Sequence, residues 1–413
     1  MKTDKKTIWL INQYASTPQT GMGGRHYYLA REMAKQGHDV YLISGSFGHK
    51  FRDKSNQKRL ITKEDVEGFT HVKIKVLTYP DSFSKKRVIN WFIFSFVLGF
   101  FVSGKLARPD AIVYSSPALV GYLGARRVAR KLNVPLIFEV RDIWPMTLVQ
   151  LGGFSVKHPF IRFLQWVEDK AYRESDHVVS NLKNAVEHMK SRGMSPKKYT
   201  WIPNGFCKDE VSNPQPLSDH VLQQLPNEKF IIGYAGAIGV ANALDILIDA
   251  AEILKEKQDV AFVLVGDGKE KTNLKALVEQ KGLKNVFFVD PIPKAQIQSM
   301  LKTFDVCYIG LTGDPLFKLG VSPNKLFDYM ASSRPIIYAI DSGAYTPISD
   351  AGCGITVPPG DSRKVAEAVV SLKSMPKDAL NDMGVNALDF SMAKHEYSQL
   401  ANRMTELVVA HES

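Results

Sequence analysis

The stretch TIWLINQYASTPQTGMGGRHYYLAREMAKQGHDVYLIS, residues 7–44, predicts the fold. It opens with a short apolar run, residues 7–12, and a glycine-rich turn follows at residues 21–24. The next residues carry apolar side chains at helical spacing, and this pattern ends at Gly37, a residue type typical of helix C-termini. A second apolar run, Val40 to Ser44, comes next. A strand, a helix and a strand joined by short links predict a parallel sheet covered by helices.

The same alternation continues along the chain, with an interruption in the middle. We expect further strands at residues 111–114, 136–140, 177–180, 230–234, 261–265, 286–289, 306–309, 335–339 and 354–357. Residues 206–228 are polar, contain three prolines and show no clear period, so we expect a linker there. The chain of 413 residues is therefore predicted to form two doubly wound α/β domains. Ligands of such sheets bind at the carboxyl ends of the strands.

Charge is unevenly distributed between the two halves. Residues 1–200 hold 33 Lys and Arg against 16 Asp and Glu, a net charge of +17, whereas residues 201–413 hold 20 against 26, a net charge of −6. The basic half suits an anionic membrane surface, a phosphorylated substrate or a nucleic acid. We expect no nucleic-acid partner, because the basic residues are spread out and no nucleic-acid-binding motif occurs.

The residues that bind metals or form disulfides are sparse. Cys207, Cys307 and Cys353 lack the spacing of a disulfide framework or a zinc site, which indicates a reducing, cytoplasmic compartment. We expect no secretory leader, because charged residues lead directly into the apolar run at residues 7–12. Asp-x-Asp, HExxH and P-loop patterns are missing, so we expect no metal and no cofactor.

One uncharged run, VINWFIFSFVLGFFVSG at residues 88–104, stands apart from the α/β pattern. Basic residues flank it, Lys85, Lys86 and Arg87 before it and Lys105 after it. A transmembrane helix needs about 20 apolar residues, which disfavours a full span. Two interpretations stay open: a buried helix of the first domain, or a helix in the membrane interface with its basic flanks on anionic lipid.

Three glycine-rich turns follow predicted strands, at residues 21–24, 233–239 and 266–268. Glycine lets the backbone approach a ligand, and a helix that starts there favours an anion. The first turn fails the GxGxxG fingerprint, because His26 stands where the third glycine would be, so a dinucleotide-dependent dehydrogenase is disfavoured. A plain tight turn is the alternative for each of them.

The run Ser322 to Met330, SPNKLFDYM, is the most informative for function. Ser322 is a good N-cap and a proline follows it, which predicts a helix start. Lys325 then lies in the first turn, where a cation opposes the helix dipole unless an anion binds nearby. Asp328, further along, could accept hydrogen bonds from ribose hydroxyls. Solvated side chains are the alternative.

Charged residues also follow the predicted strand at residues 136–140. Glu139, Arg141 and Asp142 lie at its carboxyl end, where charge indicates a site. An ordinary surface ion pair is the alternative interpretation.

Taken in order, these pieces resemble the family 4 glycosyltransferases with the GT-B fold, over nearly the whole chain. The resemblance rests on Gly23-Gly24, IPNG at 202–205, LVGDG at 264–268, PNKLFDYMA at 323–331 and GCGI at 352–355. The run RDIWP at 141–145 is similar to that of the L-fucosamine transferase subgroup of bacterial surface polysaccharide synthesis. The resemblance implies a metal-independent, retaining enzyme that adds a sugar to an undecaprenyl-diphosphate-linked acceptor at the inner face of the plasma membrane.

The implied domains are an acceptor domain at 1–205, a linker at 206–228, a nucleotide-sugar domain at 229–388 and a C-terminal helix at 389–413 that crosses back. The implied catalytic residues are Asp142, Glu139 and Lys325. Donor-binding residues are Gly23, Gly24, Gly236, Asn242, Gly266, Asp267, Pro291, Ser322, Pro323, Asn324, Lys325 and Asp328. Acceptor or membrane residues are Arg25, Arg87, Trp91, Phe92, Arg141 and Trp144.

The sequence also departs from the family. The usual Arg and Lys after the strand near Gly236 are replaced, and the first acid of the Glu-x7-Glu pattern falls on Gly320. We therefore assign the diphosphate to Lys325, its helix start and the Gly23-Gly24 turn. A sugar-nucleotide epimerase of the same fold and a non-catalytic nucleotide-sugar-binding partner stay open as alternatives.

Overall fold

The computed structural model describes residues 4–21, 23–48, 51–52, 57–81 and 84–410. The chain forms two compact units. The first comprises Met1–Pro203 together with Tyr397–Ser413, and the second comprises Asn204–Glu396. The C-terminal helix therefore belongs to the first unit, although it follows the second in sequence.

The first unit is built on an eight-stranded sheet with the order β3-β4-β2-β1-β5-β6-β7-β8. Neighbouring strands are parallel except for the hairpin of β3 and β4, which is antiparallel. The strands are β1 (Thr7–Ile11), β2 (Asp39–Gly45), β3 (Ile61–Val66), β4 (Phe69–Ile74), β5 (Ala111–Ser115), β6 (Leu136–Val140), β7 (His177–Ser180) and β8 (Tyr199–Trp201). The central strands β1, β5 and β6 are buried almost throughout, as parallel strands covered on both faces must be.

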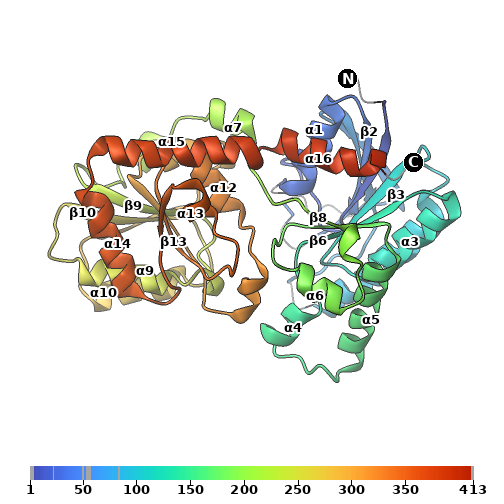
Figure 1. The fold of residues 1–413 in the computed structure, drawn as a ribbon, viewed down its shortest axis with the longest axis horizontal. Coiled ribbons are helices and arrows are strands. Elements are labelled where there is room, and N and C mark those ends of the chain that lie inside the picture. Colours follow the sequence, from blue (N-terminus) through green and yellow to red (C-terminus); the bar gives the residue numbers. More distant parts are fainter. Residues whose placement is uncertain (1–3, 22, 49–50, 53–56, 82–83, 411–413) are drawn as a thin grey trace. The chain divides into compact units, whose positions relative to one another are not determined.

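Helices connect these strands (Figure 1). They are α1 (Arg25–Lys35), α2 (Lys85–Val97) with its π-helical continuation η1 (Leu98–Val102), α3 (Gly121–Leu132), α4 (Met146–Gln150), α5 (Pro159–Glu174), α6 (Val186–Ser191), the short turn η2 (Pro196–Lys198) and α16 (Tyr397–Ala410). The Tyr28 and Tyr397 rings stack at 4.9 Å, which fixes α16 to α1.

The second unit has a six-stranded sheet with the order β11-β10-β9-β12-β13-β14, and all pairs are parallel. The strands are β9 (Phe230–Ala235), β10 (Val260–Val265), β11 (Val286–Val289), β12 (Val306–Gly310), β13 (Ile336–Ala339) and β14 (Gly354–Thr356). The helices are α7 (Lys208–Ser212), α8 (Asp219–Leu222), η3 (Val240–Asn242), α9 (Leu244–Ile253), α10 (Lys271–Gln280), η4 (Lys294–Gln296), α11 (Ile297–Leu301), η5 (Pro315–Leu319), α12 (Asn324–Ala331), α13 (Pro347–Ala351), α14 (Ser362–Ser374) and α15 (Lys377–Lys394).

Two hydrophobic cores cover the two faces of this second sheet. Alternate residues of β9 point to opposite faces, so Ile231 belongs to the core under α12 and α15, and Ile232 to the core under α9 and α14. Figure 1 shows α15 along one side of the sheet and α9 and α10 on the other.

The strands expected in both halves are confirmed within one or two residues at each end. The linker prediction for residues 206–228 is wrong. This segment contains α7 and α8, and its residues Phe206 and Val221 are buried in the core of the second unit. Apolar residues at isolated positions carry this packing, which explains why the polar composition concealed it.

The uncharged run at residues 88–104 is a helix of the first unit that is buried on one side and exposed on the other, and its contact with a membrane stays a prediction. It forms most of α2 and all of η1, with Phe94, Leu98 and Val102 buried and Phe96 and Phe100 exposed. Among the described residues, no helix has both the length and the apolar character needed to cross a membrane.

Candidate functional site

The order of the strands indicates where each unit could bind a ligand. In the first sheet, the chain passes from β1 to β2 on one side and from β5 to β6 on the other side. In the second sheet, it passes from β9 to β10 on one side and from β12 to β13 on the other side. Loops that leave such neighbouring strands diverge and leave a crevice at their carboxyl ends. The loops concerned are residues 12–24 and 116–120 in the first unit, and residues 236–243 and 311–323 in the second.

In the second unit, glycines allow the loop at residues 236–243 to pack backbone against backbone on the turn at residues 266–268, which follows β10. Gly266 has φ +139°, and a Cβ placed there would lie 2.0 Å from the carbonyl oxygen of Gly236. A Cβ on Gly268 would lie 2.0 Å from the carbonyl oxygen of Ile238. The Ile238 N–H donates to the Asp267 carbonyl at 2.8 Å. The predicted glycines thus fix the shape of the site, while the Asp267 side chain is exposed and accepts from the Gly268 N–H.

Lys325 is held beside this pair of loops. It lies in the first turn of α12, four residues before Tyr329, so both side chains share one face of the helix. The Tyr329 hydroxyl bonds both the N–H and the carbonyl of Ala235 at the end of β9, at 2.8 and 3.1 Å. This contact turns the face of Lys325 toward the loop that starts at Gly236, where an added Cβ would lie 2.9 Å from Lys325 Cε.

The ammonium group of Lys325 has neutral partners. Its Nζ donates to Asn242 Oδ1 at 2.5 Å and lies 5.1 Å from the centre of the Tyr234 ring. Within the described part of the chain, no carboxylate forms an ion pair with it. Burial lowers the pKa of Lys325 to about 8. A half-buried cation without a counter-charge favours the binding of an anion.

Asp328 lies on the same helix and already has a cationic partner. Lys294 Nζ donates to both of its carboxylate oxygens, at 2.8 and 2.7 Å, and lies 3.6 Å from Glu210. Asp328 is therefore ion-paired, and the alternative of an ordinary solvated side chain is not what the structure shows. Each carboxylate oxygen has a second lone pair, so the pair with Lys294 orients the group and still leaves it able to accept from hydroxyls.

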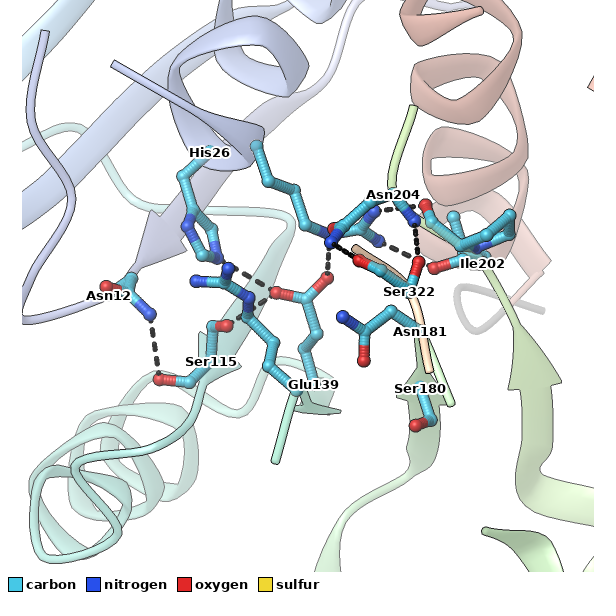
Figure 2. A network of polar contacts seen from close by, with 12 residues as sticks. Asn12, His26, Ser115, Glu139, Ser180, Asn181, Ile202, Asn204 and Ser322 are labelled. Atoms are coloured by element: carbon cyan, nitrogen blue, oxygen red, sulfur yellow. Dashed lines mark hydrogen bonds and ion pairs between the residues drawn. The ribbon is translucent and has the colours of Figure 1, made fainter. Parts of the chain in front are cut away.

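The predicted N-cap role of Ser322 is wrong. The N-cap of α12 is Pro323, which has no side-chain cap bond, and Asn324 is the first helical residue. Ser322 Oγ instead accepts from the Asn204 N–H at 2.8 Å, and the Ser322 carbonyl accepts from Asn204 Nδ2 at 2.6 Å (Figure 2). Asn204 thereby holds the residue that precedes the helix. Pro323 has no side chain that could cap the first turn, where the Leu326 N–H donates to the Pro323 carbonyl at 3.0 Å, so the N–H groups of Asn324 and Lys325 are left for a ligand.

In the first unit, Glu139 is the centre of a buried polar cluster (Figure 2). It accepts hydrogen bonds from Arg25 Nε at 2.8 Å, from His26 Nε2 at 2.9 Å and from Ser115 Oγ at 2.5 Å. Burial opposes ionisation, but the Arg25 guanidinium and the hydrogen bond from His26 outweigh it and hold the pKa of Glu139 well below its usual range. Burial lowers the pKa of His26, which indicates a neutral imidazole that donates through Nε2.

The cluster corrects two predicted roles. The side chains of Arg25 and Glu139 are both fully buried, so Glu139 cannot act directly on a substrate and Arg25 cannot contact an acceptor or a membrane. Arg25 also donates to the carbonyls of Ile202, at 2.9 Å, and Pro203. The cluster therefore fixes the start of α1 and the end of the first unit, directly before Asn204.

Other predicted residues of the first unit lie at the carboxyl edge of its sheet. Gly23 and Gly24 have φ of +66° and +104°, a conformation that glycine adopts readily, while Met22, which precedes them, lies outside the described residues. Asp142 follows β6 and is exposed. The Arg141 N–H donates to Ser116 Oγ at 2.9 Å, and its buried Nε has no hydrogen-bond partner in the described part of the chain.

Trp91 corrects another prediction. It is buried, at 3% exposure, and its Nε1 donates to the Tyr14 hydroxyl at 2.5 Å, so it does not contact a membrane. Arg87 also donates to this hydroxyl, at 3.2 Å, and the Trp144 ring packs edge-on against Trp91. Phe92, the next residue along the helix, is exposed.

The structure also offers a groove of about 650 Å³ beside η3, α9 and α10. Its lining includes Asp245 and Glu270 but no Lys or Arg. An anionic ligand therefore fits the surroundings of Lys325 better than this groove. No cluster of three or more His, Cys, Asp or Glu suited to a metal ion occurs in the described part of the chain.

Sequence reasoning missed several residues that shape these sites. Tyr14 follows β1 and Lys294 follows the Pro-Ile-Pro run after β11, so their places at strand ends could have revealed them. Asn204 and Tyr329 act through contacts with residues more than 90 positions away. No local signal in the sequence indicates such contacts.

Comparison with known proteins agrees with this architecture. Residues 20–205 match the family described as glycosyl transferase 4-like domain, and residues 229–374 match that described as glycosyl transferases group 1. WbjE of Pseudomonas aeruginosa, named a probable glycosyltransferase, is 24% identical over 77% of this chain and 80% of its own. WcaI of Escherichia coli K12, whose name assigns it to colanic acid biosynthesis, is 22% identical over 87% of this chain and 90% of its own.

Solved structures show the same fold. The structure of HepE from Anabaena in complex with UDP and glucose aligns with a TM-score of 0.68 at 15% identity, over 98% of this chain and all of that one. Two α/β domains, matched in order by a glycosyl transferase 4-like domain and a glycosyl transferases group 1 domain, identify the chain as a glycosyltransferase with the GT-B fold.

Proposed function

We propose that the chain transfers a sugar from a UDP-sugar to a lipid-linked saccharide. The observation that carries the donor half is Lys325, a half-buried cation with neutral partners at the start of α12. The UDP-bound structure of HepE supports the choice of nucleotide. The name of WcaI, which mentions colanic acid, and that of an Escherichia coli O-antigen chain mannosyltransferase support an acceptor in surface polysaccharide synthesis, such as that of O-antigen, capsule or exopolysaccharide.

The proposed donor site assigns separate tasks to residues of the second unit. Lys325 and the free N–H groups of α12 bind the diphosphate, and Asp328, oriented by Lys294, accepts from the ribose hydroxyls. Backbone near Pro291, after β11, contacts the base. As the sugar departs, negative charge grows on the leaving diphosphate, so a fixed cation there stabilises the transition state more than the ground state.

The remaining parts of the proposal concern stereochemistry and acceptor. With Lys325 as the counter-charge, transfer needs no metal, and we propose that it retains the anomeric configuration. The donor sugar is an N-acetylated amino or deoxyamino sugar, and the acceptor is an undecaprenyl-diphosphate saccharide at the inner face of the plasma membrane. In the first unit, Asp142 orients a hydroxyl, and Arg141, with its unpaired Nε, contacts the acceptor.

A turnover assay tests this proposal. The purified chain is incubated with a panel of UDP-sugars and polyprenyl-diphosphate saccharides, with and without EDTA, and UDP release is measured. We expect release that needs both substrates and continues in EDTA, with retained configuration by NMR. Absence of turnover with every donor would favour a non-catalytic partner, and conversion of the donor to its epimer without an acceptor would favour an epimerase.

A further inference from the structure

The helix formed by α2 and η1 has two opposite faces with different surroundings. Its inner face packs on α3, where Gly124 comes so close that a Cβ there would lie 2.2 Å from the Ser95 carbonyl oxygen. The Gly124 N–H donates to Ser95 Oγ at 3.1 Å. Phe94 and Leu98 on this inner face have no exposed surface. The helix is therefore firmly part of the first unit.

The opposite side, which we name the outer face, is apolar and open to solvent. It consists of Ile89, Phe92, Phe96, Phe100 and Phe101, with exposures of 48%, 46%, 55%, 50% and 44%. Four of these residues follow helical spacing, so they form one stripe. Large apolar residues of this kind rarely gather on a surface without a partner.

Helix α5 extends the outer face. The Phe92 ring stacks on Phe163 at 5.9 Å, and Phe163 stacks on Trp166 at 6.1 Å. Trp166 is 48% exposed, and Lys170 Nζ lies 5.4 Å from its ring. A tryptophan with a lysine beside it is typical of side chains at a membrane interface.

The charge around the outer face identifies the partner. Residues 85–165 contain twelve Lys and Arg against three Asp and Glu, and one of those three acids, Glu139, is buried. Lys85 and Lys86 are exposed at the start of the helix, Lys105 is exposed after its end, and the Arg127 guanidinium lies 4.0 Å from the centre of the Phe100 ring. An apolar stripe with a cationic border complements a surface of anionic headgroups over acyl chains.

We infer that the outer face docks on an anionic lipid bilayer, with its aromatic side chains at the acyl boundary and its basic border on the headgroups. This inference adds a membrane contact to the proposed function. The choice of a bilayer rests partly on that function, because a lipid-linked acceptor lies in such a surface. The helix does not span the bilayer in this arrangement, because its inner face packs against α3.

Co-sedimentation with vesicles tests the inference. The full chain should bind vesicles of phosphatidylcholine and phosphatidylglycerol, and bind pure phosphatidylcholine much more weakly. The variant Phe96→Gln/Phe100→Gln/Phe101→Gln should bind the anionic vesicles weaker by about 100-fold, because three apolar groups no longer insert. Lys85→Glu/Lys86→Glu should weaken binding by about tenfold or more, and only at low salt.

A matched control comes from the second unit. Leu222, Ile253 and Val385 are exposed to 46%, 51% and 52%, and their triple change to Gln should leave vesicle binding unchanged. The inference would be overturned if the phenylalanine variant bound anionic vesicles as well as the wild type does, or if the wild-type chain did not bind them. If the wild-type chain is a dimer and the phenylalanine variant is a monomer, the outer face would instead be a contact with a second copy of the chain. Stabilisation by UDP, measured on each variant, reports separately on the proposed donor site.

Discussion

Replacing Lys325 with Met tests the role of the cation at the start of α12. The side chain keeps its length and loses its charge, while Tyr329 continues to hold the helix against β9. A hydrogen bond to a charged group contributes about 1.5–3 kcal/mol, so the variant should bind UDP roughly 10- to 100-fold more weakly. Isothermal titration calorimetry at pH 7 measures the two dissociation constants.

The same change should stabilise the free protein. The pKa of Lys325 is about 8 in the folded chain against the ordinary 10.5. Each unit of such a shift is 1.36 kcal/mol, so the buried charge costs up to roughly 3 kcal/mol at pH 7, and methionine removes this cost. Between pH 8 and 10.5 the unfolded state binds the proton more tightly than the folded state, so wild-type stability should rise with pH in that window. The methionine variant should lack this rise.

The pH dependence of UDP binding gives a third measurement. Lys325 should be mostly protonated at pH 7 and mostly neutral at pH 9, so the wild-type dissociation constant should increase about tenfold over this range. Lys325→Arg is the matched control, because its guanidinium keeps its proton at pH 9. Equal affinity of the wild type and the methionine variant would refute the reasoning, and so would a wild-type affinity that does not change with pH.

Other changes test the surrounding structure. Glu139→Ala should lower the free energy of unfolding by about 3–5 kcal/mol in urea titrations, because the buried Arg25 loses its counter-charge, and a loss below about 1 kcal/mol would contradict the buried pair. Asp328→Asn should weaken UDP binding and leave pyrophosphate binding unchanged in calorimetry, and an equal loss for both would contradict contact with ribose. Gly266→Ala should lower Tm and the affinity for UDP, since its Cβ would collide with the Gly236 carbonyl, and an unchanged Tm would contradict the described loop packing.

The sequence was a good guide to the sheets, and the reason is physical. Buried parallel strands are short, continuous apolar runs, and each expected run, from residues 7–12 to residues 354–357, forms a strand. The hairpin of β3 and β4 was missed, because Ile61–Val66 at the sheet edge is mostly charged and exposed. Residues 206–228 were misread, since so few apolar side chains carry their packing.

The site was only partly predictable. Lys325 was identified because its place in a first helical turn is unfavourable without an anion. Glu139 was assigned to catalysis, because charge at the carboxyl end of a strand indicates a site, and Arg25 to the acceptor or membrane, whereas each is the other's buried partner. Such long-range pairs, like that of Lys294 and Asp328, depend on tertiary contacts that local patterns do not encode. At Gly320, where the resemblance implied an acid, φ is +100°, a conformation that favours glycine.

The most direct test of the proposed UDP-sugar donor site is the thermal stabilisation of the wild-type chain by UDP, compared with GDP, dTDP and NAD. A ligand that binds only the folded state adds about 2.7 kcal/mol at a hundredfold excess over Kd, so a true site gives a clear rise in Tm. The account predicts a rise with UDP that exceeds those with the other nucleotides and that Lys325→Met reduces by about half or more at the same UDP concentration. A rise with NAD alone, or no rise with any nucleotide, would contradict it.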